Sequence, residues 1–311
     1  MTGPAEARPL VSVVIPHLNQ PEFLRTCLDS LARQDWPAER TEIIVVDNGS
    51  RELPDLAGLG YPHVKLLAEA EPGPGPARNR GIAGASGEFL AFIDADCRAD
   101  AGWLSAAVAG LTAADSSGVV GGDVRIDFRD LRHLTPLEAY EAVFAYRQKL
   151  YIGRHGYSGT GNLAMRREVF DKVGPFGGIH TAEDMDWGQR ARAAGHPARY
   201  RADMIVYHPA RTSVAELQTK WRRHVAHTLV MHRQRGGSDL AWATRSAMVL
   251  ASAVPHMAAV LTSPRLSGLG NRLRGIGVLV GIRAFRAGEM LRQRSGSATA
   301  GSESWNRPSG G

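Results

Sequence analysis

The sequence predicts an α/β fold that consists of an alternating half, a mixed-sheet half and a basic helical appendage. Three observations lead to this prediction. Four short apolar runs rich in Val and Ile recur in the first hundred residues, which is typical of strands buried on both faces. Segments with helical periodicity separate these runs. After residue 118 the alternation becomes irregular, which indicates a mixed sheet.

The four strand-like runs are VSVVIP (11–16), TEIIVVD (41–47), HVKLLAE (63–69) and EFLAFID (88–94). A helical face lies between the first two runs, begins after Pro21 and is lined by Phe23, Leu24, Cys27, Leu28 and Leu31. A strand–helix–strand unit of this kind is parallel and right-handed, and its ligand crevice forms at the carboxyl ends of the strands. Asp47 and Asp94 lie at such ends.

Further elements follow the same logic. We expect helices over 75–86 and 100–111 around the fourth strand. In the second half we expect strands over 118–126, 158–165 and 198–208, and helices over 136–150 and 183–195. Their looser order predicts a sheet half that shapes a second site.

The C-terminal third has a different character. A basic amphipathic helix over 213–235 begins with a capping box, Ser213 to Glu216. Two apolar stretches flanked by arginines follow, at 246–263 and 275–282, and the tail from Ser295 is of low complexity and is predicted to be disordered. We therefore expect a catalytic domain over 1–210, a helical region over 211–294 and a disordered tail over 295–311.

Composition supports this division. The chain has 311 residues and is 43% apolar, which excludes disorder of the whole chain. Residues 211–311 hold 15 Arg and Lys against 4 Asp and Glu, whereas residues 1–210 hold 22 against 27. A basic segment attracts phosphate groups of nucleic acid or lipid.

No signal-peptide core precedes Val11, so we expect the first 210 residues to face the cytosol. Cys27 and Cys97 lack zinc or disulfide spacing and are expected to be reduced thiols.

The segment GEFLAFIDADC carries a buried strand directly into Asp94 and Asp96. Two adjacent carboxylates at a strand end are costly without a cation, and their spacing suits a hard divalent ion bridged to phosphate oxygens. Mg²⁺ or Mn²⁺ with a diphosphate fits best. A turn or helix cap is the alternative for such a pair, as is an Asx turn for Asp47.

Several motifs occur together in a fixed order along the chain. They are VVIPHLNQ (13–20), IIVVDNGS (43–50), GPARNRGI (75–82), the D-x-D motif formed by Asp94 and Asp96, GTGNLAMRREVFDKVGPF (159–176) and AEDMDWGQRARAAG (182–195). Across about residues 10–210, the chain resembles GT-A fold glycosyltransferases of family 2. The resemblance implies a Rossmann-like nucleotide-binding half and a mixed-sheet acceptor half.

The resemblance also implies site residues. It implies that the nucleotide sugar is contacted by Pro16, Asn19, Asp47, Arg78 and Asp94. It implies that the metal ion is bound by Asp94, Asp96 and His208. Asp184 is implied as the general base, with Glu183 beside it, and the acceptor side is implied to hold Gly161, Asn162 and Trp187. One departure is that His17 and Leu18 precede Asn19, so stacking on the base would have to come from His17. Alternatives remain: a structural His208, charge compensation at a helix N-terminus for Glu183 and Asp184, and a plain glycine-rich turn around Gly161.

Residues 246–264 carry no charge and approach the length of a spanning helix, but they are rich in Ala and Ser and are interrupted at Pro255. We expect residues 211–294 to lie on the inner leaflet, with arginines on lipid phosphates. The alternative is an ordinary helical subdomain with a solvated basic face. Nucleic-acid binding is disfavoured, because the basic helix has a single Trp and no recognisable module accompanies it.

The sequence thus predicts a metal-dependent, inverting glycosyltransferase on the inner face of the cytoplasmic membrane. It would move a sugar from a nucleoside-diphosphate sugar to an acceptor hydroxyl of a lipid-linked saccharide or cell-envelope glycan. Two alternatives stay open: a nucleotidyltransferase, and an inactive membrane-tethered protein that binds nucleotide sugars.

Overall fold

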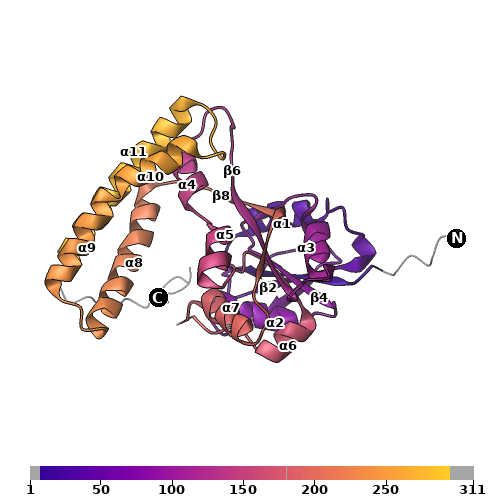
Figure 1. The fold of residues 1–311 in the computed structure, drawn as a ribbon. Coiled ribbons are helices and arrows are strands. Elements are labelled where there is room, and N and C mark those ends of the chain that lie inside the picture. The colour runs from indigo at the N-terminus through magenta and orange to yellow at the C-terminus, as the bar shows by residue number, and fades with distance from the viewer. Residues whose placement is uncertain (1–7, 180, 295–311) are drawn as a thin grey trace. The chain divides into compact units, whose positions relative to one another are not determined.

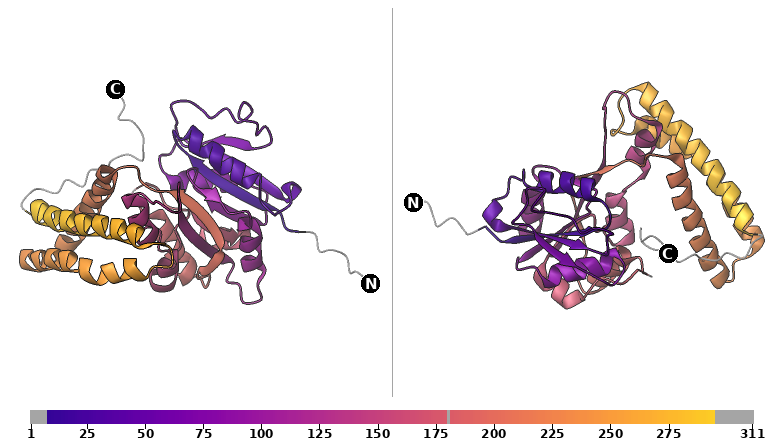
Figure 2. Two further views of the ribbon diagram at one scale, coloured as in Figure 1. Left: turned by 90° about the horizontal axis from the view of Figure 1, so that it is seen from above. Right: turned by 180° about the vertical axis from the view of Figure 1, so that it is seen from behind.

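The computed structural model describes residues 8–179 and 181–294 and divides them into two compact units. The sheet unit comprises residues 8–125 and 146–208, and the helical unit comprises 126–145 and 209–294. Figures 1 and 2 show the course of the chain through both units. Residues 126–145 lie within the span expected for the catalytic domain but group with the C-terminal helices.

Eight strands form one sheet in the order β3-β2-β1-β4-β7-β6-β8-β5. They are β1 Val11–His17, β2 Thr41–Asp47, β3 Lys65–Ala68, β4 Phe89–Ile93, β5 Arg98–Ala99, β6 Val119–Asp127, β7 Asn162–Arg166 and β8 Arg199–Pro209. β1 pairs in parallel with β2 and β4, and β2 with β3, whereas β7 runs antiparallel to β4 and β6, and β5 to β8. The predicted parallel half and mixed half are both present.

Helices cover both faces of the sheet. Residues of α1 (Pro21–Leu31) and α3 (Trp103–Thr112) pack against one face, in the cluster that contains Val13 and Ile15 of β1. Residues of α2 (Pro74–Ala83), α6 (Arg167–Val173) and α7 (Glu183–Ala193) pack against the other, in the cluster that contains Val14. Successive side chains of a strand point to opposite faces, so one apolar strand serves both clusters.

Two element predictions were wrong in detail. The helix expected over 136–150 is broken: α4 (Pro136–Phe144) ends before Tyr146, whose φ of 46° is left-handed, and α5 (Gln148–Leu150) continues into a π-helical turn, Tyr151–His155. The strand expected over 158–165 begins only at Asn162, because the residues before it form a loop. The sequence analysis also missed α6, the short strand β5 and the 3₁₀ turn Ala38–Arg40.

The helical unit contains α4, α8 (Val214–Gln234), α9 (Asp239–Ala251), α10 (Ala253–Thr262) and α11 (Leu269–Arg294). One half of the predicted capping box of α8 is present, since the Glu216 amide donates to the Ser213 hydroxyl at 3.2 Å, while the Glu216 carboxylate accepts the Thr212 and Ser213 hydroxyls instead of the Ser213 amide. Trp242 is fully buried and donates its indole N–H to the carbonyl of Met290, which joins α9 to α11. None of the helices in the described residues has the length and apolar character needed to cross a membrane. The tail predicted to be disordered, 295–311, lies outside the described residues.

Candidate active site

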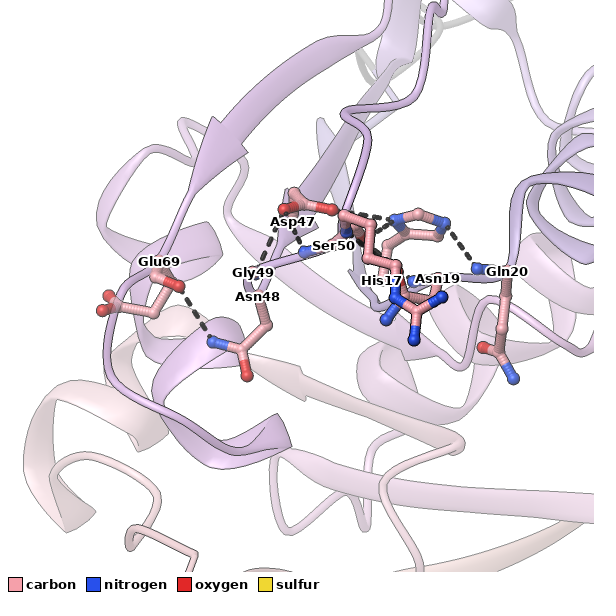
Figure 3. Close-up of polar contacts among 9 residues, drawn as sticks. His17, Asn19, Gln20, Asp47, Asn48, Gly49, Ser50 and Glu69 are labelled. Carbon is pink, nitrogen blue, oxygen red and sulfur yellow. Dashed lines mark hydrogen bonds and ion pairs between the residues drawn. The ribbon is translucent and has the colours of Figure 1, made fainter. Parts of the chain in front are cut away.

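The carboxyl ends of β1 and β2 are tied together by a buried polar cluster. The register pairs His17 with Asp47, and the His17 Nδ1 lies 3.1 Å from the Asp47 carboxylate (Figure 3). The other His17 ring nitrogen accepts the Gln20 amide at 3.2 Å. His17 is only 1% exposed, so its ring is not a surface on which a base could stack. His17 therefore does not offer the stacking surface that the sequence left open for it.

Asp47 forms the Asx turn that was the alternative to a ligand contact. One of its oxygens accepts the amides of Gly49 and Ser50 at 3.1 and 3.0 Å, while the other faces His17. Burial acts to raise the pKa of Asp47, but the hydrogen bonds from Ser50, His17 and Gly49 lower it overall. The carboxylate is thus ionised, 2% exposed, and holds the loop in shape.

Asn19 lies at the open side of this cluster. Its φ is 55°, its amide donates to the Ser50 hydroxyl at 2.8 Å, and its side-chain oxygen accepts the Arg51 amide at 2.9 Å. Asn19 is exposed, whereas Pro16 is buried within β1. Of the residues predicted to contact the nucleotide on these two strands, Asn19 is the one whose side chain faces solvent.

A second loop is fixed by Asn48, which is fully buried. Its side-chain amide donates to the carbonyl of Glu69 at 3.0 Å (Figure 3). The same amide donates to the carbonyl of Glu71 at 2.7 Å, and the side-chain oxygen accepts the Gly73 amide at 2.8 Å. These bonds position the start of α2, the helix that carries Arg78.

Arg78 connects the D-x-D segment to the acidic pair Glu183 and Asp184 at the start of α7. The Arg78 side chain is 3% exposed, and its guanidinium contacts Asp94 at 2.7 Å and Glu183 at 3.2 Å, while its Nε has no hydrogen-bond partner among the described residues. Burial raises the pKa of Glu183 despite the charge of Arg78, and Asp184 raises it further. The buried cation of Arg78 thus joins Asp94, 16 positions away in the sequence, to Glu183, 105 positions away.

Gly161 is packed directly against Asp94. A Cβ on this glycine would lie 2.5 Å from the Asp94 carboxylate. The glycine of the GTGN segment is therefore needed to admit the first acid of the D-x-D, which places β4 and the loop before β7 at the same site.

The second acid, Asp96, lies beside His208 at the end of β8. The His208 Nε2 is 3.3 Å from an Asp96 oxygen, and the His208 ring packs against Tyr146 with centroids 4.6 Å apart. Burial acts to raise the pKa of Asp96, but the hydrogen bond and charge of His208 lower it overall. A carboxylate oxygen and an imidazole nitrogen in this arrangement can hold a divalent cation.

Asp184 begins α7 next to Glu183 and differs from it in its partners. One Asp184 oxygen accepts the Met185 amide at 2.7 Å, and no cation in the described part of the chain forms an ion pair with it. Burial raises the pKa of Asp184, and the nearby charge of Asp94 adds to this while Arg78 partly offsets it. A carboxylate with a raised pKa is suited to accept a proton.

An aromatic pair lies beside Asp184. Tyr151 and Tyr157 stack with centroids 5.5 Å apart and planes 4° from parallel. The backbone of Tyr157 approaches α7 at Gly188, where a Cβ would lie 2.5 Å from that of Tyr157. Burial raises the pKa of Tyr157 to about 12, with Asp184 as the next cause.

Two residues predicted on the acceptor side lie in the core instead. Asn162 is 0% exposed, donates to the carbonyls of Asp123 and Met204 at 2.8 and 2.9 Å, and accepts the Trp103 indole N–H at 2.9 Å. Trp187 is 1% exposed and donates to the Gly174 carbonyl. Both side chains have their polar groups used internally, so their placement does not agree with acceptor contacts.

The sequence analysis missed three features of this site. Cys97 directly follows the D-x-D, and its adjacency to Asp96 was a usable signal. The sequence did not identify Tyr146 and Tyr157 as site residues, because Tyr146 lies within an expected helix and Tyr157 lies in a loop without clear periodicity. Only the chain's folding brings these rings to His208 and Asp184.

Comparisons with known proteins agree with this architecture. The model of glycosyl transferase family 2 matches residues 12–174. Glycosyltransferase AglE of Haloferax volcanii is 34% identical over 222 residues, which cover 69% of this chain and 71% of the relative. Pre-mycofactocin glycosyltransferase of Mycobacterium tuberculosis is 28% identical over 66% of this chain and 44% of its own length.

Among solved structures, the mannosyltransferase PcManGT of Pyrobaculum calidifontis, in complex with GDP-Man and Mn²⁺, is similar over 93% of this chain and 88% of that one. The TM-score is 0.58 at 19% identity, which establishes a shared GT-A fold. With the family model matching about half of the residues and a relative above 30% identity, the chain belongs to glycosyl transferase family 2.

Proposed function

We propose that this glycosyltransferase is metal-dependent and inverting, and that it moves a sugar from a nucleoside-diphosphate sugar to an acceptor hydroxyl. The observation that supports this most is the contact of Arg78 with both Asp94 and Glu183. It joins the acids of the donor side to the helix that carries Asp184, so the groups needed for donor binding and for proton removal share one site.

For the donor, the proposal uses the loops at the ends of β1 and β2. Asn19 is exposed there, and Asp47 and Asn48 hold the loops around it. Asp47 is buried, so its role in the proposal is to shape the pocket edge. Arg78 and Asp94 then act on the donor near the diphosphate. That PcManGT binds GDP-Man supports a nucleotide sugar as donor.

For the cation, the proposal uses Asp96 and His208, with Asp94 nearby. The carboxylate oxygens suit Mn²⁺ or Mg²⁺, the His208 nitrogen favours Mn²⁺ of the two, and the Mn²⁺ in the PcManGT complex supports such an ion. When bound, the ion would neutralise charge on the leaving diphosphate.

Asp184 is proposed as the general base. Glu183 is engaged by Arg78, which leaves Asp184 as the carboxylate of the pair able to accept the proton of the attacking hydroxyl. One base and direct attack give inversion at the anomeric carbon.

The acceptor is proposed to be a lipid-linked saccharide or cell-envelope glycan, reached from the inner face of the cytoplasmic membrane. The helical unit supports membrane contact. Large apolar side chains are exposed along α9, α10 and α11, among them Met248, Val254, Leu261 and Leu273. Residues 211–294 also carry 14 Arg and Lys against 3 Asp and Glu. Apolar side chains and cations together favour an anionic membrane surface.

The test is a thermal-shift screen of the full chain with UDP, GDP, dTDP, CMP and ADP, each with and without Mn²⁺. A ligand at about 100 times its Kd stabilises a protein by about 2.7 kcal/mol, or roughly 5–10 °C here. We expect a Mn²⁺-dependent shift with one nucleoside diphosphate, and transfer from the matching sugar donor with inverted anomeric configuration by NMR. No shift with any nucleotide, or retention of configuration, would overturn the proposal.

A further inference from the structure

The thiol of Cys97 lies within reach of the same cation that Asp96 and His208 are proposed to hold. The Cys97 Sγ, an Asp96 oxygen and a His208 ring nitrogen all lie within 4.8 Å of one another. The Cys97 Sγ is 3.7 Å from one Asp96 oxygen, and the His208 Nε2 is 3.3 Å from the other. Within the described ranges this is the one such cluster of three His, Cys, Asp or Glu side chains.

The fold holds these three groups together from two directions. The Cys97 amide donates to the Asp94 carbonyl at 2.9 Å, which closes a turn across the D-x-D. Directly after it, β5 pairs antiparallel with β8, with Arg98 opposite Tyr207. Continued by one residue, this register places Cys97 opposite His208. Opposed residues of antiparallel strands have Cβ atoms about 4.5–5.5 Å apart, which is close enough to share an ion.

Access to the cluster is one-sided. Cys97 is 2% exposed, whereas the side chains of Asp96 and His208 are 23% and 20% exposed. An ion entering from solvent would therefore meet the carboxylate and the imidazole first and the sulfur last.

A sulfur, a nitrogen and an oxygen ligand with one open position form a set typical of Zn²⁺, while Mg²⁺ gains nothing from a thiol. We propose that Cys97 is a third protein ligand for thiophilic cations, so that this site takes Zn²⁺ or Co²⁺ through sulfur, nitrogen and oxygen in competition with Mn²⁺. The thiol proton leaves to water as the sulfur–metal bond forms. The inference rests on the proposed function, which makes Asp96 and His208 cation ligands.

The test titrates Co²⁺ into the metal-free full chain, because a cobalt–thiolate bond absorbs strongly in the near ultraviolet. We expect the band in the wild type and in Cys27→Ala, the matched variant of the other buried cysteine. We expect it to be absent in Cys97→Ala, whose Zn²⁺ affinity falls at least about tenfold, while Mn²⁺ affinity measured by electron paramagnetic resonance stays within about threefold. Circular dichroism checks that both variants fold.

X-ray absorption on the Zn²⁺-loaded wild type gives the same answer without any variant, through a sulfur neighbour at about 2.3 Å. Mn²⁺ and Co²⁺ binding without a thiolate band or sulfur neighbour would overturn the role of Cys97 and leave the proposed function standing. A band lost only in Cys27→Ala would also overturn it. If no divalent ion binds and no nucleotide shift depends on Mn²⁺, both proposals fail.

Discussion

At the residue scale, the two carboxylates at the start of α7 differ in what surrounds them. Glu183 contacts the Arg78 guanidinium, whereas one Asp184 oxygen accepts the Met185 backbone amide and forms no ion pair with any cation in the described residues. Burial is the main cause of the raised pKa of Asp184. A base is active when deprotonated, so activity falls as pH drops through this raised pKa. We expect the acid limb of kcat/KM to lie above the pKa of an ordinary aspartate, 3.8. A pH–rate profile with the limb at or below that value would contradict the assignment.

Replacing Asp184 separates catalysis from folding. We expect Asp184→Asn to reduce transfer by about 10²-fold or more with donor binding nearly unchanged. Because the folded-state pKa is raised, the stabilising effect of the protonated carboxyl is lost as pH rises through that value, so the ionised side chain costs stability at neutral pH. The amide removes this cost, and Tm should rise by a few degrees at most.

Asp186→Asn is the matched control, because Asp186 lies on the same helix and pairs with Arg190 at 2.9 Å. It should leave turnover within about threefold, since that pair is partly exposed. Equal losses of turnover in the two variants, or a lower Tm for Asp184→Asn, would indicate that Asp184 is structural.

Gly161 tests the packing around the first acid. A Cβ there would meet the Asp94 carboxylate at 2.5 Å, so Gly161→Ala has to push that side chain away from its position beside Arg78. We expect donor affinity to fall by about tenfold or more, equivalent to about 1.4 kcal/mol. Gly153→Ala, with nothing within 4 Å of the added carbon, should have no effect on affinity. Calorimetric titration with the nucleoside diphosphate and Mn²⁺ measures both, and unchanged affinity in Gly161→Ala would show that this contact does not matter.

The residues of the site were predictable to different degrees. The local pattern placed Asp94 and Asp96 just after a strand and Asp184 in the first turn of a helix, whereas their roles in the site were predicted from the family resemblance. Asn162 and Trp187 were not predictable, because their motif identifies a segment but not the direction of each side chain. In β7 that direction follows from register against β4, where Asn162 pairs with Ile93.

At the element scale, the strands of the alternating half followed directly from apolar runs, and β2 was predicted residue for residue. The break between α4 and α5 was not predicted, because Ala145 to Leu150 contains neither Gly nor Pro. Tyr146 adopts a left-handed φ, which is uncommon for a tyrosine and cannot be read from its residue type. Tyr157, which follows the turn at Tyr151–His155, packs against α7 at Gly188, and no local pattern in the sequence indicates this contact.

That packing gives a prediction for the interface between α7 and the tyrosine pair. Gly188→Ala places a Cβ 2.5 Å from the Tyr157 Cβ and 2.8 Å from its Cα, so the helix or the loop must shift. We expect a loss of about 1–3 kcal/mol in the free energy of unfolding, as for other overpacked sites. Gly288→Ala, in α11 with open space around it, should instead be neutral or stabilise by up to about 1 kcal/mol. Urea denaturation measures both, and a stability unchanged by Gly188→Ala would contradict the close approach.

At the scale of the whole molecule, charge and exposed apolar area are unevenly divided between the parts of the chain. The helical unit exposes Leu250, Val254 and Leu261 in a stretch free of charged residues, and arginines lie on either side of it in the sequence. The sequence predicted this basic and apolar region. It could not predict that residues 126–145 would join it, because that grouping depends on long-range contacts.

The membrane proposal can be tested with substitutions of equal chemistry on the two units. Val254 is 69% exposed in α10 and Leu53 is 64% exposed in the sheet unit, so neither glutamate variant should unfold the protein. The wild type should sediment with vesicles containing phosphatidylglycerol and be released by high salt, since cations on anionic lipid are screened. Val254→Glu should weaken that binding by about tenfold, because a charge replaces an inserted apolar side chain. Leu53→Glu should bind like the wild type. Equal binding of all three proteins would show that the exposed face of α10 does not enter the lipid, and no binding by the wild type would remove the membrane contact from the proposed function.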